Sequence, residues 1–76
     1  MNYNRRKKLG EAKLVLEKAK DIVSDVLDEE DEARDNMPES LQGSERYENS
    51  ERCSDAMNEA IESIDSAIEN LETAEN

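Results

Sequence analysis

The chain has 76 residues, of which 41% are charged and 34% apolar, and its 21 acidic residues against 10 basic ones give a formal net charge of −11. This length allows one small domain and excludes a two-domain enzyme. The chain has no histidine and one cysteine, which excludes a structural zinc site, a histidine-based triad and an internal disulfide. No apolar run approaches the roughly 18 residues of a membrane span, and no signal-peptide pattern opens the sequence.

Apolar residues recur at steps of three and four in the first half of the chain, which predicts a helix over about 4–35. Their stripe consists of Leu9, Ala12, Leu16, Ala19, Val23, Val26, Glu30, Ala33 and Met37, and is widened by Val15, Ile22 and Leu27. Glu30 interrupts this stripe, so we expect weaker burial there. Gly10 costs about 1 kcal/mol relative to alanine, so we expect the helix to fray before it.

The segment over about 36–43 reads as a connector between two helices. Pro38 disfavours helix at the residue before it, and Gly43 can adopt the left-handed conformation that closes a turn. Ser44 then offers a side-chain oxygen as the N-cap of a following helix. The chain is therefore expected to form a helix, a short connector and a second helix.

A cleaner helical pattern predicts the second helix over about 44–74. Its stripe consists of Cys53, Met57, Ala60, Ile64, Ala67, Leu71 and Ala74, with Ile61 and Ile68 beside it. The segments 60–66 and 67–73 form a seven-residue repeat, which is the period of a coiled coil. Because Cys53 lies on this stripe, we expect its side chain to pack in the core.

These elements predict an all-α fold, a single 1–76 domain built as an antiparallel two-helix hairpin that resembles a coiled coil. Residues 1–20 carry a net charge of +5 and residues 21–76 a net charge of −16, which favours an antiparallel arrangement. In it, Arg5–Lys8 would lie beside Glu69, Glu72 and Glu75. The chain has only 13 Val, Ile and Leu residues, so we expect further burial against a partner. A second copy, giving a dimeric four-helix bundle, is the simplest partner, and a bound target protein is the alternative.

Two surfaces are candidates for binding a partner protein. Acidic residues recur along the second helix at steps of three and four, and Glu59, Glu62, Asp65 and Glu69 are the candidates for contact with a basic surface. The alternative is that these carboxylates only keep the helix solvated. At the connector, Leu41, Arg46 and Tyr47 are candidate anchors of a docking tip; the alternative is that Leu41 and Met37 cap the hairpin and Tyr47 packs on the first helix.

No feature of the sequence predicts an enzyme, a cofactor or a metal site. The acidic block Asp28–Glu32 lacks the spacing and the glycine of an EF-hand, and Cys53 has no histidine to activate it. The basic run Arg5–Lys8 could bind nucleic acid, but the rest of the molecule would repel phosphates. We expect no membrane association.

The connector carries a resemblance. The segment Asn36–Tyr47, Asn-Met-Pro-Glu-Ser-Leu-Gln-Gly-Ser-Glu-Arg-Tyr, resembles the connector of short proteins from bacteriophages and prophages of Gram-positive bacteria, in which a basic first helix precedes it and an acidic heptad helix follows. No catalytic or binding residues are assigned in that group. The resemblance implies a phage protein in the cytoplasm of a bacterial host.

Together these observations favour a small acidic accessory protein that binds and modulates or inhibits a host protein, such as a defence or nucleic-acid-processing factor. Such a protein would present its acidic helix face to a basic surface. A self-associating assembly adaptor is the alternative. A nucleic-acid binder that uses the N-terminal basic arm is a weaker alternative.

Overall fold

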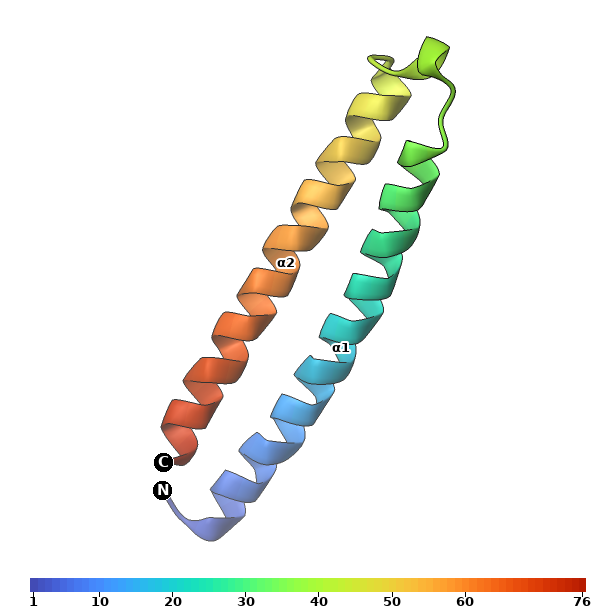
Figure 1. The fold of residues 1–76 in the computed structure, drawn as a ribbon. Helices are drawn as coiled ribbons and strands as arrows, with labels where there is room; N and C mark the ends of the chain where they lie inside the picture. The colour runs from blue at the N-terminus through green and yellow to red at the C-terminus, as the bar shows by residue number, and fades with distance from the viewer.

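In the computed structural model, which describes all 76 residues, the chain is entirely helical apart from short connections. Helix α1 spans Tyr3–Asp35, a 3-10 helix spans Glu39–Leu41, and helix α2 spans Glu45–Glu75. Figure 1 shows α1 and α2 running antiparallel and side by side, in a rod of 59 × 14 × 12 Å. The prediction of an all-α chain with two helices is confirmed, and both long helices begin and end within one residue of the expected positions.

Side chains cap both long helices at their N-termini. The Ser44 side-chain oxygen accepts a hydrogen bond from the Tyr47 N–H at 3.2 Å, as expected for α2. The Asn2 side chain accepts one from the Arg5 N–H at 2.9 Å, so α1 begins at Tyr3 and is continuous through Gly10. Gly43 has a φ of 86°, the left-handed conformation that lets the connector turn into α2.

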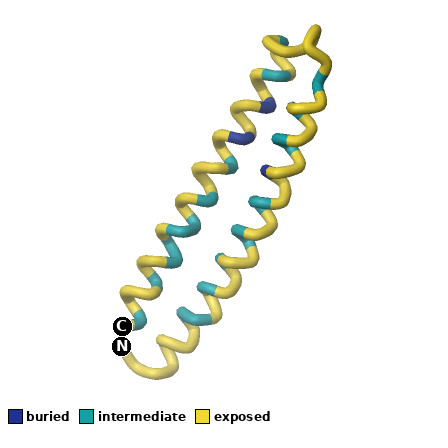
Figure 2. Tube along the Cα trace, in the orientation of Figure 1, coloured by how far each residue is buried: buried dark blue, intermediate teal, exposed yellow.

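The two helices meet along one line of side chains, which we call the seam. Its members recur at alternating steps of three and four, the coiled-coil pattern, and none of them is fully exposed (Figure 2). The seam consists of Leu9, Lys13, Leu16, Lys20, Val23, Leu27, Glu30, Arg34 and Met37 from the first half, and of Tyr47, Ser50, Ser54, Met57, Ile61, Ile64, Ile68, Leu71 and Glu75 from the second.

The seam differs in phase from the predicted apolar stripes. In α1 the expected core alanines Ala12 and Ala33 are exposed, and in α2 Cys53, Ala60 and Ala74 are exposed. The prediction that Cys53 packs in the core is therefore wrong. The physical reason is that α2 turns its larger side chains inward, so that Ile61 and Ile68, expected at the edge, lie in the seam.

The core is thin and has polar ends. Leu27, at 9% exposure, is the only apolar residue that counts as buried; the other two buried residues are Ser50 and Ser54. Polar side chains occupy seam positions near both ends of the rod, and Lys20 and Glu30 interrupt the apolar seam residues between them. A pair of helices alone therefore leaves much of each apolar side chain in contact with water.

Candidate functional site

The seam divides the surface of the hairpin into two opposite long faces. In both helices one face is formed by the residues directly after seam residues, and the other by the residues directly before them. A two-fold rotation about an axis perpendicular to the plane of the hairpin approximately relates the two antiparallel helices. Residues of α1 and α2 that stand at the same offset, one position after or one position before a seam residue, therefore lie on the same face. The sequences at these two offsets are very different.

The residues that follow the seam form an acidic face. It carries Glu17, Asp21, Asp28, Asp31 and Asp35 from α1 and Glu48, Glu51, Asp55, Glu62, Asp65, Glu69 and Glu72 from α2. Between Gly10 and Asp35 and between Glu48 and Glu72, no basic residue occupies this offset. Along a helix such carboxylates stand about 5–6 Å apart, so the face presents two nearly continuous rows of negative charge.

The residues that precede the seam form an apolar face. It carries Ala12, Val15, Ala19, Ile22, Val26, Glu29 and Ala33 from α1 and Cys53, Ala56, Ala60, Ser63, Ala67, Asn70 and Ala74 from α2. Glu29 is the single charged residue among them. Val15, Ile22 and Val26 are 67%, 55% and 47% exposed, so the largest apolar side chains of this face lie in water in the single hairpin.

The structure separates the seven candidate partner-binding residues into two groups. Glu62, Asp65 and Glu69 lie on the acidic face, and Glu59 projects from α2 directly away from α1. Tyr47 lies about 22 Å along α2 from Glu62, at 1.5 Å per residue. The docking tip and the acidic stripe are therefore separate surfaces.

At the connector, the three candidate anchors have different environments. Leu41 is 42% exposed on the 3-10 helix, and Arg46 is exposed on the first turn of α2. Tyr47 occupies a seam position and is half-buried, in line with the alternative that it packs on the first helix. Leu41 and Arg46 remain accessible to a partner.

A polar cluster that the sequence analysis missed lies at the connector end of the seam. The Arg34 guanidinium donates to the Ser50 carbonyl and hydroxyl oxygens, both at 3.2 Å, and to the Ser54 hydroxyl at 2.7 Å. It also donates to the Asp31 carboxylate at 2.7 Å, and the Ser54 hydroxyl donates to the same carboxylate oxygen at 2.7 Å. The signal in the sequence is the recurrence of Lys13, Lys20, Leu27 and Arg34 at steps of seven residues, a pattern in which three of the four members are charged.

Hydrogen bonding changes the acidity of this cluster. The Ser54 hydroxyl, and then the Arg34 guanidinium, lower the pKa of the Asp31 carboxyl group below its ordinary value. The hydrogen bond to Asp31 raises the pKa of Arg34. Both groups therefore keep their charges, and the cluster joins α1 to α2 by directional bonds that only one register of the helices satisfies.

Two lysines of the seam extend across to acids of α2. Lys20 lies 2.6 Å from the Asp65 carboxylate, and Lys13 lies 3.0 Å from Glu75. The hydrogen bond to Asp65 is the main cause of a raised pKa of Lys20. The expected pairing of Arg5–Lys8 with Glu69, Glu72 and Glu75 does not occur, because this register places Glu75 opposite Lys13 and leaves Arg5–Lys8 beyond the end of α2.

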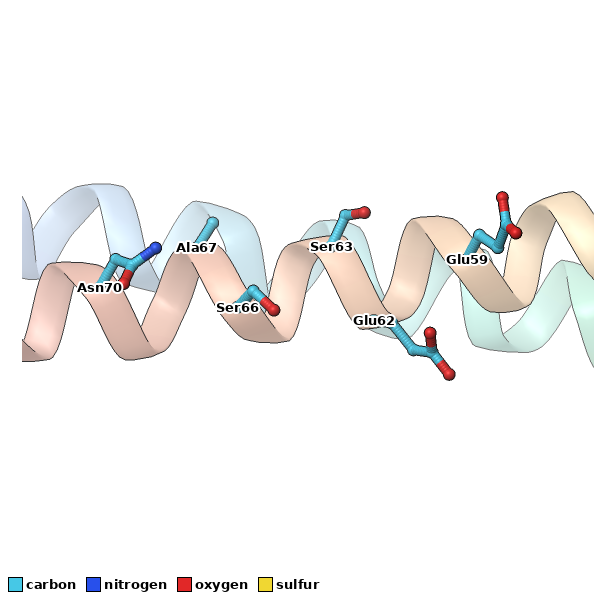
Figure 3. Close-up of a pocket in the computed structure, with 6 residues that line it drawn as sticks. All are labelled: Glu59, Glu62, Ser63, Ser66, Ala67 and Asn70. Carbon is cyan, nitrogen blue, oxygen red and sulfur yellow. The ribbon is translucent and has the colours of Figure 1, made fainter.

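The one surface depression has a volume of about 560 Å³ and lies on α2 alone. Figure 3 shows that its lining comes from a single helix, so that it has no opposing wall. Its lining residues are Glu59, Glu62, Ser63, Ser66, Ala67 and Asn70. It spans the back of α2 between the acidic and the apolar faces.

No three acidic or cysteine side chains converge closely enough to hold a metal ion. Neither helix has an apolar stretch of the length needed to cross a bilayer. Comparison of the chain with family models, with curated proteins and with solved structures gave no match.

Proposed function

We propose that the protein is a non-enzymatic binding module whose acidic face binds a partner protein through a basic surface. The observation that carries this proposal is the segregation of charge: the acidic face has twelve carboxylates and no base at its offset, while the opposite face has one charge between Ala12 and Ala33 and none between Cys53 and Ala74. A surface that served only solubility would need no such separation, since charge on any exposed position keeps a protein in solution.

Rigidity supports the same proposal. The carboxylates stand on two helices whose register is held by the Arg34 cluster and by the Lys20–Asp65 pair. Side chains fixed on helices lose less freedom on binding than side chains on loops, so less of the binding energy is spent on ordering them. A row of fixed charge also accelerates encounter with an oppositely charged surface.

The resemblance of the connector to phage proteins supports a setting for this partner. We propose a host protein that binds nucleic acid, such as a defence or nucleic-acid-processing factor, because its basic cleft matches an extended row of carboxylates. Occupation of that cleft would block its normal ligand. The exposed Leu41 and Arg46 would add contacts at the tip of the rod.

The test compares two variants of equal net charge. In the first, Asp55→Asn, Glu62→Gln and Glu69→Gln remove three carboxylates from the acidic face. In the control, Glu11→Gln, Asp25→Asn and Glu32→Gln remove three from the back of α1. Tagged proteins are used to capture partners from a lysate of a Gram-positive bacterium, and mass spectrometry identifies the captured proteins.

We expect the wild type and the control to retain the same basic proteins and the acidic-face variant to lose them. Equal retention by both variants would contradict the proposal, because it would mean that the position of the removed carboxylates does not affect binding. Circular dichroism of each variant verifies that the hairpin remains helical.

Self-association into a dimeric four-helix bundle is a second candidate. A specific observation favours it: Val15, Ile22 and Val26 stay largely exposed while the seam buries only Leu27 among apolar residues. Covering these side chains would stabilise the chain by roughly 25 cal/mol per Å² of apolar surface buried. This association uses the apolar face and leaves the acidic face free, so the two candidates are compatible.

A further inference from the structure

We propose that a second copy of this chain docks on the apolar face with its α1 antiparallel to the first α1, around a two-fold axis at Ala19. This inference rests on the self-association proposed above and adds its face, orientation and register. The symmetry of the residue pattern and the placement of charge along the rod both favour a second copy as the occupant.

The α1 part of the apolar face is self-complementary. A two-fold axis at Ala19 sets each residue of one α1 opposite the residue of the second α1 that brings the sum of their numbers to 37 or 38. Each such pair occurs twice, once on either side of the axis. Val15 then faces Ile22 of the second copy, and Ala12 faces Val26. Each pair places a smaller side chain against a larger one, and Ala19 meets Ala19, which lets the helices approach closely at the axis.

The charged residues at the two ends of the α1 part of the apolar face favour the same antiparallel register. Lys8 precedes Val15 by seven residues, and Glu29 follows Ile22 by seven. The antiparallel register sets Lys8 against Glu29 of the second copy, at both ends of the contact. A parallel arrangement would instead set Lys8 against Lys8 and Glu29 against Glu29, which is repulsive.

The whole hairpin has the same asymmetry. Residues 21–65, which form its connector half, carry sixteen acids and three bases, a net charge of −13. Residues 1–20 and 66–76, which form the half with the termini, carry five acids and seven bases, a net charge of +2. Stacking two hairpins with their connectors at the same end would bring the two negative halves together, whereas the opposite orientation separates them.

The antiparallel dimer also gives a role to Arg5–Lys8, which contact no acid in the single hairpin. They would lie beside the acidic connector half of the second copy.

On α2, the residue level with Ala19 is Ala67, since Lys20 pairs with Asp65 and Lys13 with Glu75. The axis therefore crosses a small residue on both helices, and the two copies can approach along their full width.

The first measurement is the mass in solution by sedimentation equilibrium. We expect the wild type to have twice the mass of the 8.7 kDa chain. Ile22→Asp, on the apolar face, should dissociate it. Leu14→Asp is the matched control, because Leu14 is 66% exposed on the opposite side of α1, and it should leave the dimer intact.

The second measurement is disulfide formation in a Cys53→Ser background, which removes the native thiol and tests the register even in a weak dimer. Disulfides require Cα atoms about 4.4–6.8 Å apart. Ala19→Cys should cross-link to its own copy at the axis. Ala12→Cys alone should not, because the two copies of this residue would lie about 21 Å apart at 1.5 Å per residue. Ala12→Cys combined with Val26→Cys should cross-link again.

The third measurement is a charge exchange. Lys8→Glu and Glu29→Lys should each weaken the dimer by roughly tenfold, the order expected for two exposed ion pairs replaced by repulsive ones. The double variant Lys8→Glu/Glu29→Lys should restore most of the wild-type affinity. Restoration would not occur if the two residues were not opposite each other.

The outcomes distinguish self-association as such from its antiparallel arrangement. A wild type that remains monomeric at millimolar concentration would overturn self-association and this inference together. A stable dimer in which Ala12→Cys cross-links to itself, or Ala19→Cys does not, would overturn the antiparallel arrangement alone. Capture of a basic partner through the acidic face would be unaffected by either result.

Discussion

At the scale of single residues, Arg34 makes more side-chain hydrogen bonds between the two helices than any other residue. Its guanidinium bonds to three side chains and one carbonyl, and these join α1 to α2 across a part of the seam where the neighbouring side chains are serines. Serine hydroxyls buried without partners would be costly. Arg34 and Asp31 satisfy them, so the polar end of the seam is a specific contact and not a defect in an apolar core.

The acidity of Asp31 gives a pH-dependent prediction. A carboxyl group with a lowered pKa in the folded state stabilises the fold above its unfolded pKa of about 3.9, and this contribution is lost as the pH falls through the folded value. At pH 7 we expect Asp31→Asn to melt several degrees below the wild type. The difference should shrink as the pH is lowered through and below about 4, as followed by thermal unfolding with circular dichroism.

Asp28→Asn is the control for this experiment. Asp28 lies in the same acidic block, is exposed and makes no hydrogen bond or ion pair. Its neutralisation removes one repulsive charge from the acidic face, so it should raise the melting temperature slightly or leave it unchanged. If Asp28→Asn and Asp31→Asn have the same effect at every pH, the Asp31 cluster does not stabilise the hairpin.

At the scale of the elements, the existence and ends of the two helices could be predicted from the sequence, because Pro38, Gly43 and Ser44 act locally. The phase of the helices could not. In α1 the residues Leu9, Leu16 and Val23 recur every seven positions. They are flanked on one side of the helix by Ala12, Ala19 and Ala33 and on the other by Lys13, Lys20 and Arg34, and hydropathy favours burial of the alanines. The structure turns the charged residues inward, because lysine and arginine bury their aliphatic stems while their charged ends reach Asp65, Glu75 and Asp31.

The candidate site was predictable to a similar extent. Glu62, Asp65 and Glu69 were found because a three-and-four spacing identifies one helix face without any knowledge of tertiary structure. That the acids of α1 join the same face depends on the register between the helices, which single-helix periodicity does not contain. The Arg34 cluster also depends on that register, since its members come from residues 16 to 23 positions apart across the connector.

The two glycines allow opposite predictions from the same substitution. Gly10 is helical, and a Cβ there would meet only the Glu75 Oε1 atom at 4.0 Å, an ordinary contact. Gly10→Ala should therefore raise the free energy of unfolding by about 0.5–1 kcal/mol. Gly43→Ala should lower it by about 1–2 kcal/mol, because its φ of 86° is strained for a residue with a Cβ.

Urea unfolding followed by circular dichroism measures both glycine variants against the wild type. A destabilising Gly10→Ala would mean that Glu75 packs more tightly at the end of the seam than its 4.0 Å separation indicates. A neutral Gly43→Ala would mean that the connector can turn without a left-handed residue.

At the scale of the whole molecule, the hairpin is a rod with two chemically different sides. The acidic face concentrates repulsion, and the apolar face leaves Val15, Ile22 and Val26 in water. Each side is destabilising for an isolated hairpin. A basic partner on one side and a second copy on the other would relieve these two costs separately, which is why the molecule is suited to act within an assembly.

Salt should therefore act in opposite directions on folding and on partner binding. Raising NaCl from about 0.01 to 0.5 M screens repulsion within the acidic face, so the melting temperature of the free protein should rise. The same screening should weaken capture of a basic partner. Melting curves and capture at matched salt concentrations measure the two effects.

The variant Asp55→Asn/Glu62→Gln/Glu69→Gln provides the control, because it carries fewer of the repelling charges. Its gain in melting temperature with salt should be smaller than that of the wild type. If salt lowers the melting temperature of the free protein, the ion pairs of the seam outweigh repulsion in the acidic face.

The position of the Arg34 cluster also sets the order in which the hairpin closes. Its bond to Ser50 spans 16 residues, whereas the bond between Lys13 and Glu75 at the other end spans 62. Closing the longer loop first would cost about 1.2 kcal/mol more in chain entropy, at about 0.6 kcal/mol per doubling of length. Folding should therefore nucleate beside the connector and propagate toward the termini, and the same end should be the last to separate when the helices come apart.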